Sequence, residues 1–316
     1  MSISSGHVSM PTCLGFCGRT TFINESNSNT PELSRCGACP WGERANKYSI
    51  CEPCETPLTA YDWMYLLFIA LLPLLLHMQF IRSARKYCRS RHFELSEHIC
   101  VLLENTIACI TAILAYPPRF SFVLNGCEKT SYKEWYPASH NPTVEFTKPM
   151  RCSYEVVFPL YSIVFLHHLI LIFSMFILRS TLYCLLLHKL FNGKPYYYGL
   201  LSLPLLVLVH GTLSGFLYIM FPWILLTGSI FAMVYHLALE GKRSIREMIV
   251  RLFSSTMHIL FLIITTLLLI FSLIALVTYH NEWSYRWHLL WFVPAPFVSY
   301  LFTMPFSHPS SIPHAD

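Results

Sequence analysis

The chain has 316 residues, of which 54% are hydrophobic and only 12% are charged, and its formal net charge is +5. Soluble domains are roughly a quarter charged, so this composition excludes an ordinary water-soluble globular protein. The apolar residues gather in runs of about 20, the length that one helix needs to cross a bilayer. The sequence therefore predicts an all-α polytopic membrane protein.

The first 60 residues form a polar segment rich in cysteine. It holds six of the twelve cysteines, which are Cys13, Cys17, Cys36, Cys39, Cys51 and Cys54. A segment with so little apolar content needs crosslinks to hold a fold, which favours disulfides in an oxidising lumen. The spacing of the last four also fits a zinc site made of four thiolates, so zinc is the alternative. The pairing among the six cannot be deduced.

Two further features belong to the predicted lumenal side. Asn24 begins the sequon Asn24-Glu25-Ser26, which makes it a candidate glycosylation site. Cys127 and Cys152 bracket the loop between the second and third apolar runs. We expect these two cysteines to pair with each other and to close that loop.

Seven apolar runs are predicted to span the membrane. They cover residues 61–81, 98–116, 154–178, 196–214, 221–239, 257–279 and 287–304. The fourth and fifth come from one apolar block, and we expect a tight turn between them near Gly211, Gly215 and Pro222. One helix with a re-entrant segment would leave six spans. The predicted organisation is a lumenal segment (1–60), a seven-helix transmembrane domain (61–304) and a short cytosolic tail (305–316).

Basic residues near the ends of the spans predict the orientation, because Lys and Arg there are retained in the cytosol. The loop after the first span is the most basic, with Arg82, Arg85, Lys86, Arg89 and Arg91. We therefore predict that this loop is cytosolic and that the N-terminus is lumenal. Following the spans alternately also places Arg179 and the C-terminus in the cytosol.

Ionisable side chains within a bilayer are costly and are candidate functional residues. Glu104 lies about two turns into the second span, where its carboxyl group must be protonated, paired or exposed to a wet crevice. An interhelical hydrogen bond is the structural interpretation, and contact with a client or partner is the functional one. His167 and His168 are adjacent in the third span, where polar groups often serve helix packing. No catalytic constellation is evident, and neither a cofactor nor a nucleic-acid partner is expected.

Several segments carry a family resemblance. They are CLGFCG at residues 13–18, CGACPWGERAN at 36–46, CEPC at 51–54, YDWMYLLFIALLPLLLH at 61–77, YEVVFPLYSIVF at 154–165 and PAPFVSYLFT at 294–303. In these segments and in their order along the sequence, the chain resembles the family of Jun-kinase-associated membrane proteins. The resemblance implies a non-enzymatic scaffold in the endoplasmic reticulum membrane. Its implied partners are Jun kinase, proteasome subunits and membrane ubiquitin ligases, which it would recruit to degrade misfolded proteins.

A seven-helix cell-surface receptor with a Cys-rich N-terminal segment is the alternative function. The Asp/Glu-Arg-Tyr triplet that many such receptors carry after the third span is absent, and Leu178-Arg179-Ser180 stands there. This difference favours the scaffold.

A candidate kinase-docking segment follows the first span. Its residues are Arg85, Lys86, Arg89 and Arg91, followed by Phe93 and Leu95. Mitogen-activated kinases bind basic residues through an acidic patch and alternating apolar residues through a groove. Retention of positive charge in the cytosol explains the same basic residues without a kinase.

Overall fold

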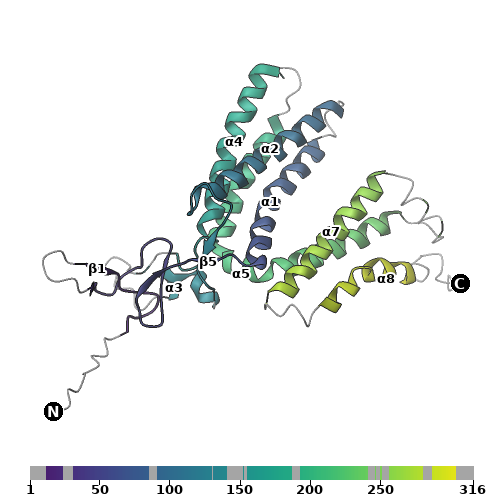
Figure 1. The fold of residues 1–316 in the computed structure, drawn as a ribbon. Helices are drawn as coiled ribbons and strands as arrows, with labels where there is room; N and C mark the ends of the chain where they lie inside the picture. The colour runs from purple at the N-terminus through teal and green to yellow at the C-terminus, as the bar shows by residue number, and fades with distance from the viewer. Residues whose placement is uncertain are drawn as a thin grey trace, which may run out of the picture. The chain divides into compact units, whose positions relative to one another are not determined.

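The structure is a computed structural model that describes residues 12–23, 31–84, 91–129, 131–140, 152, 155–186, 193–240, 246, 250, 256–279 and 287–303. Most of these residues are helical, and the strands lie in the N-terminal part of the chain (Figure 1). The chain divides into two compact units, Met1–Phe216 and Leu217–Asp316, and each is described by itself.

Three small antiparallel sheets form the head of the first unit. They pair β1 (Thr21–Ile23) with β2 (Pro31–Leu33), β3 (Glu43–Ala45) with β4 (Cys51–Pro53), and β5 (Thr56–Pro57) with β6 (Asn125–Gly126). Two-stranded sheets of this length are not stable in isolation. The third sheet joins the segment before the first helix to the segment after the second, so it brings distant parts of the chain together.

Four disulfides hold this head together. They are Cys13–Cys36, Cys39–Cys51, Cys17–Cys152 and Cys54–Cys127. The N-terminal segment is thus disulfide-rich, as predicted, and the zinc alternative fails because all four of its cysteines are oxidised.

The predicted pairing of Cys127 with Cys152 is wrong. The β5–β6 pairing sets Thr56 opposite Gly126, which brings Cys54 beside Cys127 with their Cα atoms 4.7 Å apart. Cys152 pairs with Cys17 instead. Both loop cysteines are therefore tied to the N-terminal segment.

The membrane part of the first unit contains α1 (Ala60–Ala84), α2 (Arg91–Ala115), α4 (Ser162–Leu186) and the first part of α5 (Gly193–Glu240). The short η2 (Tyr132–Trp135) and α3 (Pro137–His140) lie between α2 and α4 in the chain. The helices α1, α2 and α4 lie side by side (Figure 1).

Polar side chains set where α1 and α4 begin. At α1, the Thr59 hydroxyl accepts a hydrogen bond from the Asp62 amide, and the Asp62 carboxylate accepts one from the Thr59 amide, which makes a reciprocal capping box. At α4, one carboxylate oxygen of Glu155 accepts hydrogen bonds from the amides of Tyr161 and Ser162, each at 3.0 Å. The third predicted span therefore begins at Ser162 rather than at residue 154.

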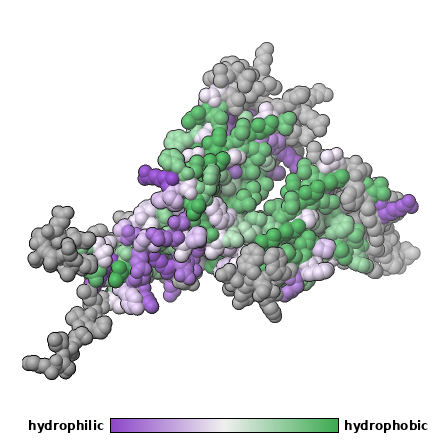
Figure 2. Space-filling view, in the orientation of Figure 1, coloured by the Kyte–Doolittle hydropathy of each residue, from purple (hydrophilic) through white to green (hydrophobic). Residues whose placement is uncertain are grey.

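The helices carry large apolar residues on their outer surfaces as well as in their core. On α2 the buried face includes Glu104 and Ala108, whereas Leu102, Leu103 and Ile107 are exposed. Figure 2 shows hydrophobic residues over the helices and hydrophilic residues over the head. A soluble protein would bury these leucines, so this arrangement fits a lipid solvent.

Five helices in the described part of the chain are long and apolar enough to cross a membrane, namely α1, α2, α4, α5 and α7 (Thr256–Thr278). The apolar part of α5, Lys194–Ala238, has 45 residues and is about 68 Å long at 1.5 Å per residue. That length is more than twice the roughly 30 Å hydrocarbon core. The seven-span count is not reproduced.

The predicted turn between the fourth and fifth spans is corrected, because α5 is helical through Gly211, Gly215 and Pro222. Gly211 and Gly215 are four residues apart, so in a regular helix the Gly215 amide donates to the Gly211 carbonyl. The Tyr161 hydroxyl donates to the Gly211 carbonyl, and the Gly215 amide donates to the Tyr136 hydroxyl. Side chains inserted in this way perturb a helix without requiring a chain reversal.

The last predicted span is also corrected. It consists of η3 (Trp287–Phe292) and the nine-residue α8 (Ala295–Thr303), and its apolar helical stretch is shorter than a span. Pro294 and Pro296 lie at the junction and lack the amide hydrogens that a continuous helix would use. Within the second unit, α5 residues Met233 and Leu237 are buried against Phe297 and Leu301 of α8.

The disulfide pattern makes a direct prediction. Proteolysis of unreduced protein should release linked peptides joining Cys17 to Cys152 and Cys54 to Cys127, because both disulfides are formed in the folded head and the β5–β6 pairing holds the second in place. Mass spectrometry identifies them, and the Cys13–Cys36 peptide is the internal control. A peptide linking Cys127 to Cys152 would contradict the fold. Removing either of the two long-range disulfides should cost about 2–5 kcal/mol of stability.

Candidate functional site

Arg179 of α4 is buried among the membrane helices, with only 4% of its surface exposed. Its Nε donates to Oε1 of Glu104 at 2.7 Å, and its Nη2 donates to Oε2 of the same carboxylate at 3.0 Å. Glu104 is 1% exposed. This is a bidentate pair, the strongest geometry that a guanidinium and a carboxylate can form.

Two more side chains complete the cluster. Arg179 Nη1 lies 3.3 Å from Oε2 of Glu97, and Nη2 lies 3.1 Å from Nε2 of His77. A guanidinium only donates, so Nε2 of His77 accepts and the ring is neutral. We call these four residues the Arg179 clamp. They come from α1, α2 and α4, so one guanidinium links three helices.

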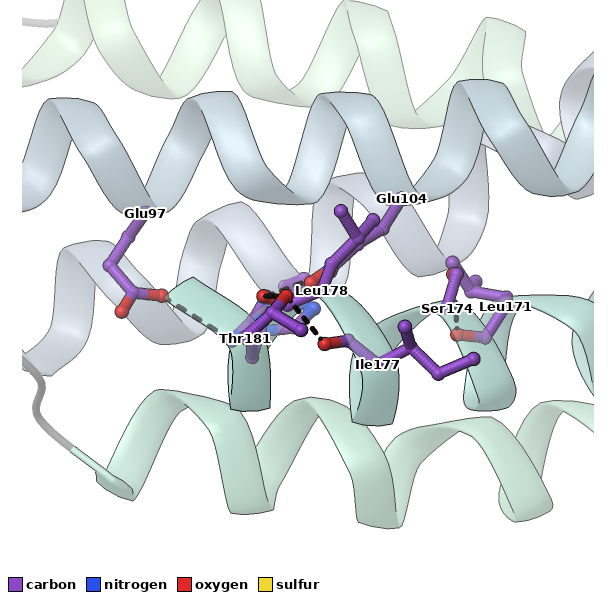
Figure 3. A network of polar contacts seen from close by, with 9 residues as sticks. Glu97, Glu104, Leu171, Ser174, Ile177, Leu178 and Thr181 are labelled. Atoms are coloured by element: carbon purple, nitrogen blue, oxygen red, sulfur yellow. Dashed lines mark hydrogen bonds and ion pairs between the residues drawn. The ribbon is translucent and has the colours of Figure 1, made fainter. Parts of the chain in front are cut away.

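The local sequence explains why α2 supplies both carboxylates. Glu97 and Glu104 are seven residues apart, about two helical turns, and so share one face. In Figure 3 both side chains extend from α2 toward the α4 segment that carries Leu178 and Thr181. The carboxylates can therefore meet opposite sides of the same guanidinium.

The helix α5 closes the cluster from another side. The Tyr196 ring centre lies 5.3 Å from Cζ of Arg179, a cation–π contact. A Cβ at Gly199 would lie 2.4 Å from Cε1 of His77. Only glycine therefore allows α5 to approach α1 this closely.

The clamp is suited to fixing helices rather than to chemistry. One permanent cation faces two carboxyl groups, and every member is engaged with another. In hydrocarbon, breaking such a pair leaves a charge that the solvent does not stabilise. Among the described residues, no group of three or more His, Cys, Asp and Glu side chains could hold a metal ion.

The structure shows what surrounds Arg179. The sequence placed this residue just after a third span ending at residue 178, and in the structure it lies in α4, seven residues before the helix ends. Its position in the cytosol stays a prediction. Two acidic residues on one face of an apolar helix signal that a cation must be buried nearby. Arg179, at the end of the third predicted span, is the residue that meets these carboxylates.

A second ion pair lies where the head meets α1. Lys129 Nζ is 2.6 Å from Oδ2 of Asp62, the residue that also caps α1. Burial lowers the pKa of the Lys129 ammonium group, and the Asp62 carboxylate opposes that shift. The head is thus joined to the first helix by charge as well as by disulfides.

The remaining predicted residues fall into different surroundings. Nδ1 of His168 lies 2.7 Å from the Val164 carbonyl, and His167 lines a cavity between helices. Leu95 is 61% exposed on α2. Of the docking candidates, Arg91 and Phe93 lie in the first turn of α2. The candidates outside the described residues are Arg85, Lys86, Arg89 and Asn24.

Comparison with known proteins decides the family. The family model described as JNK1/MAPK8-associated membrane protein matches residues 13–309. The chain belongs to this family. It is 58% identical, over 322 aligned positions that cover 98% of each chain, to the JNK1/MAPK8-associated membrane protein homolog of Caenorhabditis elegans. It is 31% identical to the JNK1/MAPK8-associated membrane proteins of mouse and human, over 96% of each chain.

No solved structure matches the chain. The family resemblance, which was drawn from the cysteine-rich motifs and the first span, is confirmed. The relatives align across 96% or more of the chain.

The clamp can be tested by comparing a single replacement with a paired replacement in this family member. Glu104→Ala should destabilise the protein by about 3–5 kcal/mol, because it leaves the Arg179 guanidinium buried without its bidentate partner. Replacing both residues, as Glu104→Leu with Arg179→Met, should restore much of that loss. Unfolding of helical structure in detergent micelles gives the free energies.

The matched control for the clamp is Glu52→Gln. Glu52 is an exposed glutamate that accepts a hydrogen bond from Asn46, so its replacement should change stability by less than about 0.5 kcal/mol. A double variant as unstable as Glu104→Ala would show that the pair does not couple α2 to α4.

Proposed function

We propose that the chain is a scaffold of the endoplasmic reticulum membrane that binds a Jun kinase and recruits proteasome and ubiquitin-ligase components to misfolded proteins. The support is a match to its family over nearly the full length, and relatives whose names associate them with the kinase JNK1/MAPK8. The clamp fits this role, because its four side chains hold helices together and leave the ends of those helices for partners.

The disulfides support the orientation that we propose, in which the N-terminal segment is lumenal. Cys17–Cys152 and Cys54–Cys127 tie the segment before α1 to the segment between α2 and α4, so both segments lie on one side of the membrane. Disulfides persist in oxidising compartments, which favours the lumen for that side. The basic residues after α1 then lie in the cytosol, in agreement with retention of positive charge. An odd number of spans would place residues 305–316 in the cytosol as well.

Sealed microsomes test this orientation. A tag before Met1 should resist added protease, whereas a protease site inserted in residues 85–90 should be cut, because two disulfides anchor the head in the lumen. Immunoblotting before and after detergent gives the result, and cleavage of both sites in detergent is the control. A digested N-terminal tag in sealed vesicles would overturn the orientation.

The cytosolic contact surface for the kinase is proposed at the start of α2. Leu95 is exposed there, while His77, Glu97 and Arg179 nearby are buried in the clamp. The docking peptide would place the basic residues against an acidic patch and Phe93 with Leu95 in an apolar groove. The clamp would hold the start of α2 in a fixed position for this contact.

The scaffold role is tested in cells that lack the protein. Misfolded membrane and secretory proteins should be cleared more slowly, because their link to the proteasome is lost, and pulse-chase measures their half-lives. The wild-type chain should restore clearance. A variant with Phe93→Ala and Leu95→Ala should restore clearance yet recover less kinase in pull-downs, since each buried side chain contributes about 1–3 kcal/mol.

The matched control for this variant is Leu102→Ala with Leu103→Ala. These are two exposed leucines further along α2, and their loss should leave kinase recovery unchanged. Unchanged client half-lives in cells lacking the protein would reject the scaffold. Equal kinase recovery by the Phe93 and Leu95 variant would reject the docking segment alone.

A further inference from the structure

A cavity of about 170 Å³ lies between α1, α2 and α4. Its walls are almost wholly apolar and include Trp63 and Ala70 of α1, Ala112 of α2, and Ile163 and His167 of α4. Trp63 is 36% exposed and the neighbouring Leu67 is 49% exposed, so the cavity borders the lipid-facing surface. A ligand would enter it from the bilayer.

His167 lines this cavity, and neither the clamp nor the scaffold role explains it. Its side chain is 94% buried, and neither ring nitrogen has a hydrogen-bond partner among the described residues. The adjacent His168 differs, because its Nδ1 lies 2.7 Å from the Val164 carbonyl. A buried polar group without a partner costs about 1–3 kcal/mol. A ligand that satisfies the imidazole would recover that cost.

The depth of His167 restricts the chemistry of the ligand. The cavity lies at the head-facing ends of the helices, since Ile163 is the second residue of α4. His167 is five residues beyond Ser162, or about 7.5 Å further along the helix. A phosphate-bearing headgroup at that depth would be desolvated against apolar walls. A single hydroxyl group would satisfy one of the two ring nitrogens, because it can either accept from the protonated nitrogen of a neutral imidazole or donate to the other.

The walls restrict the shape of the ligand. Ile69, Ile113, Ile163 and Val164 are β-branched and have few side-chain rotamers, while Ala70 and Ala112 leave the hollow between them. A rigid apolar ring body loses less conformational freedom in such a site than a flexible acyl chain does. We propose that this cavity binds the hydroxyl-bearing end of a sterol, with the hydroxyl group hydrogen-bonded to His167. A cavity of about 170 Å³ is close to the size of one that holds benzene, so the rest of the ring body lies outside it, against the lipid-facing surface of the helices. This site does not depend on the scaffold role.

The test uses the full-length protein in lipid nanodiscs with a photoactivatable cholesterol. Labelled peptides should come from α1, α2 or α4, and excess cholesterol should abolish the labelling. The 3-methyl ether of cholesterol should compete less well, because it cannot donate a hydrogen bond. His167→Phe should reduce labelling about fivefold or more, which corresponds to the loss of one buried hydrogen bond.

Two further variants make the test specific. Ala70→Leu keeps the imidazole but fills the cavity, and it should also reduce labelling. His258→Phe removes a histidine from α7, which does not line the cavity, and it should leave labelling unchanged. Recovery of the Cys54–Cys127 peptide in each variant reports a folded head. The proposal is overturned if folded His167→Phe and Ala70→Leu proteins label like the wild type, or if diacylglycerol competes better than cholesterol.

Discussion

The pair between Arg179 and Glu104 determines how the helices of the first unit can be arranged. Hydrocarbon does not solvate a guanidinium, so Arg179 can lie within α4 only if carboxylates meet it from a neighbouring helix. Glu104 supplies the bidentate contact and Glu97 a second one, which fixes both the register and the facing sides of α2 and α4. His77 and Gly199 then require α1 and α5 to pack closely around the same point.

Disulfides provide the corresponding constraint at the other end of the same helices. Cys54–Cys127 lies near the beginning of α1, and Cys17–Cys152 ties the N-terminal segment to the chain that leads into α4. The clamp lies seventeen residues along α4 from its start, so the two constraints act at opposite ends of one bundle. The sterol cavity lies between them, close to the head. Walls that are fixed at both ends can retain a hollow that a looser bundle would close.

This arrangement suits a scaffold better than a catalyst. Many polar side chains of the described helices hold helices together, whereas the buried polar atoms of His167 and Ser214 have no hydrogen-bond partner among the described residues. The exposed faces of the helices are apolar and suited to lipid. Contacts with soluble partners would then come from the segments at the helix ends, and the rigid bundle would set the spacing of those segments.

The sequence by itself determined the features that depend on local composition. Hydropathy identified α1, α2, α4 and α7, since about 20 apolar residues suffice to define a span. Thiol density identified the disulfide-rich segment, and the cost of burying a carboxylate singled out Glu104. The distinctive sequence motifs in the first 80 residues identified the family.

The tertiary structure decided every feature that depends on which segments meet. Cys127 and Cys152 are close in sequence, yet the β5–β6 pairing and the head bring each to an N-terminal cysteine instead. The sequence did not show that Arg179 meets two carboxylates on α2. Gly215 looked like a turn, although its amide donates to Tyr136 within a continuous helix. A residue's partner in space is set by the packing of whole elements, and hydropathy and spacing along one chain carry no information about that packing.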